Sequence, residues 1–146
     1  MSEFDALPPG WARVTLANVT QPSSAKVEPS DCGHLPYVGL EHIESGTCRL
    51  TGHGYARDVK STKTLFRRGD VLYGKLRPYL RKVWRAEFDG VCSTDILVYP
   101  PSEAVDGGFL AYVLASEAMT EHAVQASAGI NLPRVNASAL GEAVFL

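Results

Sequence analysis

The stretch Arg67–Asp95, RRGDVLYGKLRPYLRKVWRAEFDGVCSTD, combines apolar, aromatic and cationic residues in one continuous run. Ten lysines and arginines lie between Arg57 and Arg85 against two aspartates, and the rest of the chain holds only four lysines and arginines. Because the formal net charge of the 146-residue chain is only −2, its charge is strongly polarised along the sequence. This pattern argues against a protein that coats a polyanion with its whole surface, and it leaves room for a protein with one cationic face.

Short apolar segments separated by turn residues make this run typical of β-structure. Arg67–Asp70 predicts a turn, Val71–Tyr73 a strand, and Val91–Tyr99 is the most strand-like run of the chain. Pro78 cannot donate to a β-ladder, so regular structure is expected to end across Gly74–Pro78. Further strands are predicted for Trp11–Val19 (or a short strand plus a turn), Pro36–Ile43, Thr62–Phe66 and Ala143–Leu146.

Helical periodicity appears only near the end of the sequence. Phe109–Gln125 places its large apolar residues on one broad face and predicts the main helix, which Gly129 is well placed to terminate. A short helical turn is expected near Asn136–Leu140. The length fits one domain.

Several functions lack the residues that they need. The chain has no Gly-rich phosphate loop followed by Lys-Ser/Thr, and no metal-dependent nuclease or methyltransferase motif can be completed. Cys32, His34, Cys48 and His53 do not have the spacing of a tetrahedral zinc site. The sequence therefore predicts no catalytic residues, no metal and no cofactor. Three widely spaced cysteines and the absence of an apolar run long enough to span a membrane predict a cytoplasmic protein with reduced thiols.

The cationic run has two interpretations that charge alone leaves open. Lysines and arginines that neutralise phosphates bind DNA by releasing counterions, and arginine can also bond guanine in a bidentate manner. Alternatively, the cations form a solvated face on a protein-interaction or structural domain.

The sequence resembles the target recognition domain of type I restriction–modification specificity subunits. The most specific match is Gly69–Val83, GDVLYGKLRPYLRKV. The other matching segments, in order, are Leu7–Trp11 with Val14–Val19, Tyr37–Glu44, Phe88–Asp95, Phe109-Leu110 with Tyr112–Leu114, and Gly129–Val135. The long helix that follows this domain in the family, and that spaces two such domains, is missing.

The resemblance implies a fold and a function. The expected fold is α+β, with a curved, double β-helix-like arrangement of strands and a few helices, which suits the predicted order of elements. Residues 1–146 would form a single recognition domain, the first of two in a full-length subunit. It would bind double-stranded DNA and recognise one half of a bipartite site, while methyltransferase and restriction subunits methylate adenine and cleave.

The predicted DNA contacts fall into three groups. Arg57, Lys60 and Lys63 are expected on an exposed loop or edge, and the Gly-rich segment Ser45–Tyr55 before them is expected to carry base readout. A second group is expected to contact the DNA backbone, and Arg134, with Asn131, forms a weaker third candidate. The second group consists of Lys75, Arg77, Tyr79, Arg81 and Lys82.

Overall fold

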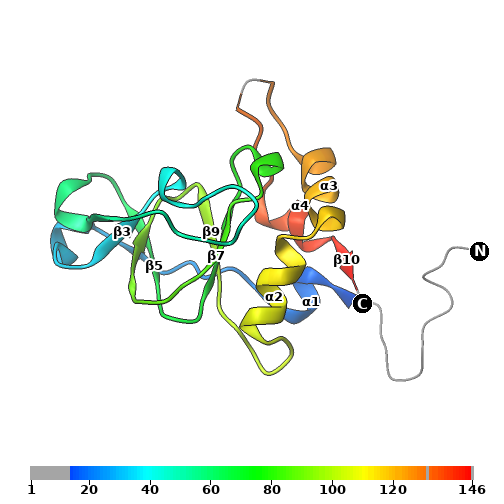
Figure 1. Cartoon of the computed structure of the whole chain (residues 1–146), viewed down its shortest axis with the longest axis horizontal. Helices are drawn as coiled ribbons and strands as arrows, with labels where there is room; N and C mark the ends of the chain where they lie inside the picture. The colour runs from blue at the N-terminus through cyan, green and yellow to red at the C-terminus, as the bar shows by residue number, and fades with distance from the viewer. Residues whose placement is uncertain (1–13, 131, 146) are drawn as a thin grey trace, which may run out of the picture.

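The computed structural model describes residues 14–130 and 132–145. The segment Leu7–Trp11, which resembles the opening of the family, and the candidate Asn131 therefore lie outside the described residues. The strands form three sheets, and the α-helices gather at the end of the molecule where β1 and β10 pair (Figure 1). With η for 3₁₀ turns, the elements are β1 (Val14–Thr15), α1 (Leu16–Val19), β2 (Lys26–Val27), η2 (Pro29–Cys32), β3 (Pro36–Val38), η3 (Leu40–His42), β4 (Gly54–Tyr55), η4 (Ala56–Asp58), β5 (Lys63–Phe66), β6 (Val71–Gly74), η5 (Pro78–Leu80), β7 (Val83–Arg85), β8 (Gly90–Cys92), β9 (Ile96–Tyr99), α2 (Gly107–Leu114), α3 (Glu117–Ala126), α4 (Ala137–Gly141) and β10 (Val144–Phe145).

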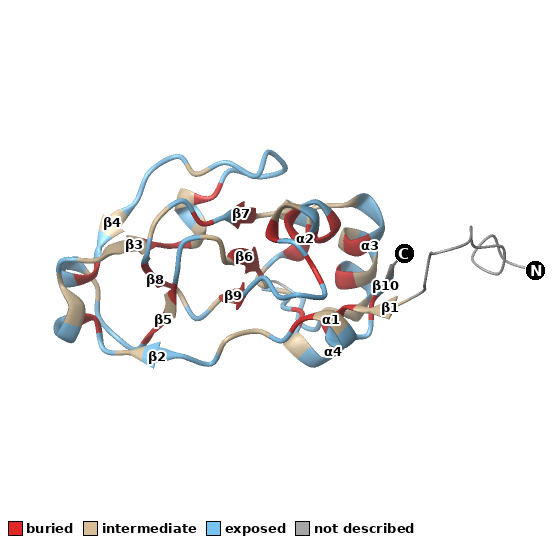
Figure 2. Cartoon of the chain, turned by 90° about the horizontal axis from the view of Figure 1, so that it is seen from below, coloured by how far each residue is buried: buried red, intermediate tan, exposed pale blue. Residues whose placement is uncertain are grey.

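An antiparallel sheet with the strand order β7-β6-β9 lies in the middle of the molecule (Figure 2). Side chains alternate between the two faces of a strand, and here both faces are buried. On β6, Val71 and Tyr73 pack in the core beneath the helices, whereas Leu72 packs in a second core with the five-stranded sheet. On β7, Val83 joins the first core and Trp84 the second. This sheet therefore connects two hydrophobic cores.

The second sheet has the order β2-β5-β8-β3-β4. Its pairs are antiparallel except for β3 with β8, which run parallel with Tyr37 opposite Val91. Gly90 begins β8 opposite Phe66. A Cβ atom on Gly90 would lie 2.7 Å from the ring of Phe66 and 2.7 Å from the carbonyl oxygen of Pro36. The central strand thus passes its neighbours at a distance that only glycine permits.

The predicted single helix over Phe109–Gln125 is wrong in one respect, because the structure has two helices there. Helix α2 ends at Leu114, and Ser116 starts α3 by accepting a hydrogen bond from the Met119 N–H on its side-chain oxygen, at 3.2 Å. Serine is a strong N-cap, so a helix start competes with continuation at this position. The short helix predicted near Asn136–Leu140 is confirmed as α4.

Three predicted strands also need correction. Of Pro36–Ile43, only Pro36–Val38 is a strand, because the chain then turns into the 3₁₀ helix Leu40–His42. Within Trp11–Val19, only Val14–Thr15 is a described strand, and Leu16–Val19 is a helical turn. The run Val91–Tyr99 is interrupted at residues 93–95, where the Ile96 N–H donates to the Ser93 carbonyl at 3.0 Å. Its two halves, β8 and β9, belong to different sheets.

The predicted α+β class is confirmed, since the strands β2 to β9 come before the helices α2, α3 and α4 and do not alternate with them. The double β-helix-like arrangement is not confirmed: the described strands form sheets of two, five and three strands. In the described part of the chain, no helix combines the length and apolar character needed to cross a membrane.

Candidate nucleic-acid interface

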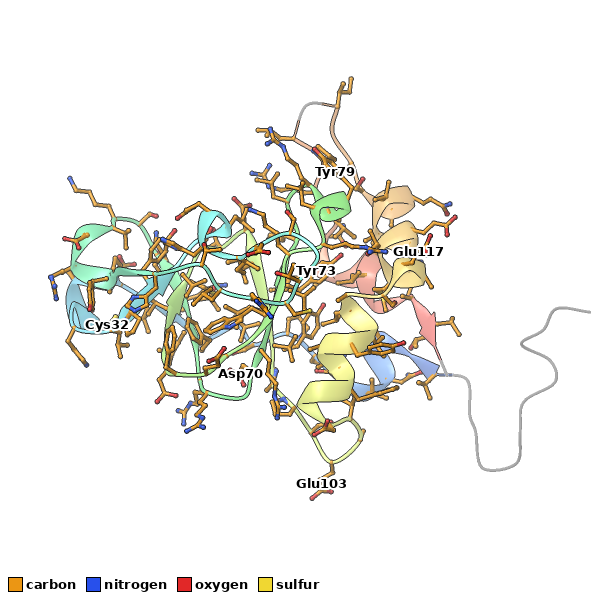
Figure 3. All side chains as sticks on the ribbon, viewed as in Figure 1. Cys32, Asp70, Tyr73, Tyr79, Glu103 and Glu117 are labelled. Carbon is orange, nitrogen blue, oxygen red and sulfur yellow. The ribbon has the colours of Figure 1, made fainter. Side chains whose placement is uncertain are left out.

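The turn that follows β6 presents an aromatic residue between two arginines. Arg77 and Arg81 flank η5 with left-handed backbones, at φ values of 53° and 51°. This conformation costs a non-glycine residue about 1–2 kcal/mol. Surrounding contacts hold it, since the Arg77 N–H donates to the Pro133 carbonyl and Arg81 Nε donates to Thr120 Oγ1. Tyr79, between them, is 54% exposed and lies in the upper part of the molecule in Figure 3, below the tip of the loop that follows α3.

A segment near the end of the chain is tied to this turn. Arg134 forms β-bridges with both Leu76 and Ala128. The Val135 N–H also donates to the Lys75 carbonyl at 3.0 Å. The structure therefore brings Arg134, predicted as a separate third candidate, beside the group that contains Lys75 and Arg77. Lys75 and Arg134 also line one cavity of about 420 Å³.

Among the described residues, the guanidinium of Arg134 has an acidic partner in Asp95. Arg134 Nε donates to Asp95 Oδ1 at 3.0 Å, and the two side chains are 48% and 30% exposed. Such a partly exposed pair contributes little to stability. The guanidinium can therefore exchange the carboxylate for another anion at small cost.

Part of the Gly-rich segment also reaches this turn. Ile43 and Leu50 form a bridge that closes residues 44–49 into a loop. The Gly46 N–H donates to the Arg81 carbonyl at 3.1 Å, so this loop lies against the residue that ends η5. Arg49 is exposed within the loop and was not among the predicted contacts. Its only sequence signal was a cation in a loop already expected to read bases.

Arg57 and Lys60 lie elsewhere. Arg57 belongs to η4, which packs on η2 at the end of the molecule away from the α-helices (Figure 1). Its guanidinium lies 4.4 Å from the centre of the Tyr55 ring. Lys60 and Arg57 line a cavity of about 360 Å³ with Glu28. The first predicted group is therefore separate from the second, to which Lys75 and Arg77 belong.

Lys63 differs from what the sequence predicts, and the ammonium group of Lys82, like that of Lys63, bonds to backbone. Lys63 was expected on an exposed loop or edge, but it starts β5 and is 7% exposed. Its Nζ donates to the Lys60 carbonyl and, at 2.8 Å, to Ser61 Oγ. Lys82 Nζ donates to the Leu40 carbonyl at 2.6 Å. Both ammonium groups thus hold backbone in place.

Replacing Lys63 by methionine tests this structural role. The Lys63→Met variant retains the apolar stem and loses the charged hydrogen bonds, which contribute about 1.5–3 kcal/mol to stability. We expect the free energy of unfolding in urea to fall by about that amount, while the salt dependence of any DNA binding stays unchanged. A variant with wild-type stability and a weaker salt dependence of DNA binding would mean that Lys63 contacts DNA and has no structural role.

The remaining arginines form another cluster. Arg67 and Arg68 lie in the turn before β6, where the Arg67 N–H donates to Asp70 Oδ2 at 2.9 Å. Arg85 lies over the start of α2, since a Cβ on Gly107 would come within 3.1 Å of its Nε. In Figure 3 Asp70 lies below the middle of the molecule and Tyr79 in its upper part. The continuous cationic run of the sequence is therefore divided by the fold into three places.

Burial determines the chemistry of the thiol and phenols in the cores. Desolvation raises the pKa of the Cys92 thiol to about 12. Burial also raises the pKa of the Tyr73 and Tyr99 hydroxyls. These groups stay protonated at neutral pH, so Cys92 does not supply a thiolate nucleophile.

Comparison with known proteins gives a consistent result. No family model matches the chain. Over 142 residues the chain is 32% identical to the specificity subunit of the type I restriction enzyme EcoDI of Escherichia coli, which covers 96% of this chain. The chain is a homologue of type I restriction specificity subunits. The match covers 32% of the EcoDI subunit, so this specificity-subunit homologue spans about a third of that relative.

Solved structures show the same fold. The HsdS subunit from Thermoanaerobacter tengcongensis superposes with a TM-score of 0.78 at 24% identity, over 94% of this chain and 38% of that one. A chain from a structural study of assembly and conformational transition of the type I restriction–modification system gives a TM-score of 0.82 at 23% identity, over 95% and 38%. The arrangement of sheets and helices in this homologue is thus that of part of a specificity subunit.

Proposed function

We propose that this chain binds duplex DNA and recognises a short sequence within it. The observation that carries the proposal is the convergence of three segments far apart in sequence, residues 44–50, 75–82 and 128–135, through backbone hydrogen bonds. Together they carry Arg49, Lys75, Arg77, Arg81 and Arg134. Homology to a restriction specificity subunit supports DNA, rather than an acidic protein, as the polyanion.

The segments differ in what they can do. Lys75, Arg77 and Arg134 stand on backbone that is cross-linked by bridges, which suits phosphate contacts that set the register on the duplex. The loop of residues 44–49 is attached to this cross-linked backbone by a hydrogen bond from the Gly46 N–H to the Arg81 carbonyl. We assign base readout to this loop, with Arg49 as the side chain able to bond guanine. Arg57 and Lys60 lie too far along the molecule to share this surface and would contact flanking phosphates.

In the restriction–modification system, the chain would act as one recognition domain. It would read one half of a bipartite target, and the partner methyltransferase and restriction subunits would methylate adenine and cleave DNA. The third of the EcoDI subunit that the chain spans supports a single recognition unit. We assign the chain no catalytic step and place it in the cytoplasm with its DNA.

Selection from a random-sequence duplex pool tests the proposal. The wild-type chain should retain duplexes on a filter with a strong dependence on salt, since phosphate contacts release counterions. Successive rounds should enrich a short common sequence. Retention without enrichment would leave DNA binding but remove sequence recognition. If no duplex is retained at low salt, the chain is a protein-interaction domain instead.

A further inference from the structure

Two exposed apolar residues, Ile130 and Leu132, form a tip above residues 75–77 and 134, which we call the cationic base. Ile130 is 98% exposed and Leu132 is 48% exposed. Both lie in the loop that rises beyond η5 at the top of Figure 1. Single exposed apolar residues are common on protein surfaces, so exposure alone does not assign a role. The role is assigned from the backbone geometry of the loop that carries Ile130.

The base of this loop is closed on both sides. Ala128 and Arg134 exchange two backbone hydrogen bonds of 2.9 Å, and Leu76 bridges Arg134 on its other side. Gly129 has a φ of +105°, which favours glycine, and a Cβ there would lie 3.0 Å from the Leu132 carbonyl oxygen. Gly129 therefore favours this turn, and the turn holds Ile130 away from the body of the protein.

The surroundings of the tip match one kind of occupant. Lys75 and Arg134 line the cavity at its foot together with Leu132, and the Arg77 N–H donates to the neighbouring Pro133 carbonyl. Cations spaced around an apolar prominence complement a duplex, whose phosphates surround stacked bases. Isoleucine and leucine are among the side chains that enter DNA between base pairs and kink it.

We propose that Ile130, with Leu132 beside it in the same loop, is an apolar wedge that enters the base stack of bound duplex DNA. The inference rests on the DNA binding proposed above and adds to it a deformation of the duplex. Since pyrimidine–purine steps unstack most easily, the wedge favours sequences that place such a step beneath the tip. Part of the specificity then arises without a hydrogen bond to a base.

Fluorescence of 2-aminopurine, which increases when the base unstacks, tests the wedge. A duplex enriched by the wild-type chain is resynthesised with 2-aminopurine at successive adenine positions. Wild type should raise the fluorescence at one step, and Ile130→Ala should abolish the rise. The slope of affinity against salt should be unchanged in this variant, because Ile130 neutralises no phosphate. Val144→Ala is the matched control, since Val144 is an aliphatic residue of β10 that is 49% exposed, and it should behave as wild type.

The outcomes separate the two proposals. A fluorescence rise that persists in Ile130→Ala, or enriched duplexes that show no rise at any position with wild type, overturns the wedge and leaves DNA binding intact. Failure of the wild-type chain to retain any duplex overturns DNA binding, and the wedge with it.

Discussion

Gly90→Ala should lower the free energy of unfolding by about 3 kcal/mol, the upper part of the range for overpacked cores. The new methyl group would meet the Phe66 ring and the Pro36 carbonyl oxygen, each at 2.7 Å. Neither can move freely. Phe66 packs edge-on against Trp84 with ring centres 5.8 Å apart, and Pro36 lies in β3, which pairs with β8 itself. Relief of the clash would therefore separate strands at the centre of the five-stranded sheet.

Gly52→Ala is the matched control for this substitution. A Cβ on Gly52 would meet nothing within 4 Å, and Gly52 is exposed. Its effect should stay within about 0.5 kcal/mol, as for most surface substitutions. Chemical denaturation of both variants, followed by tryptophan fluorescence, measures the difference. Equal stability of the two variants would mean that β8 does not pass β3 and β5 as closely as described.

The largest functional effect is expected from neutralising the cationic base. Each phosphate contact contributes about 0.9 to the slope of log affinity against log salt. The triple variant Lys75→Gln, Arg77→Gln and Arg134→Gln should therefore reduce this slope by up to about 2.7 and lower affinity about 100- to 1000-fold at moderate salt. All duplexes should be affected alike, because these residues are proposed to position the DNA backbone. Filter binding across a salt series measures both quantities.

A second triple variant separates local contacts from overall charge. Arg67→Gln, Arg68→Gln and Arg85→Gln remove the same charge from the cluster near Asp70, and should leave the slope near that of wild type. If the two triple variants lose affinity equally, binding depends on net charge and the proposed interface is wrong. Circular dichroism of both variants checks that the fold is retained.

The sequence predicted the elements whose signals are local. Strands at Thr62–Phe66 and Val71–Tyr73 and the helical turn at Asn136–Leu140 were found within a residue or two. Breaks within apolar runs were missed at Ser93 and Ser116. In both places the two flanking elements each contribute buried apolar residues, so apolar content alone does not mark the break. The only local signal was a serine able to cap a helix or a turn.

The candidate interface was less predictable because its geometry is non-local. Nothing in the sequence near Arg134 indicates that its backbone pairs with Leu76. The burial of Lys63 was also hidden, since a lysine at the end of a strand is usually solvated and this one turns back onto the Lys60 carbonyl. The charge pattern left room for a single cationic face. The fold distributes those charges over three places, and only tertiary contacts determine which cations share a surface.

The pairing of β1 with β10 has a consequence for the order of folding. Val14 lies opposite Phe145, and the Leu16 N–H donates to the Ala143 carbonyl at 2.9 Å. This sheet joins the first described residues to the last, so a ribosome must release nearly all of the intervening chain before the pair can form. Contacts between residues so distant in sequence slow folding, because a long loop must close before they contribute. During synthesis, α1 therefore lacks its contacts with α4 and Ala143 until those residues emerge.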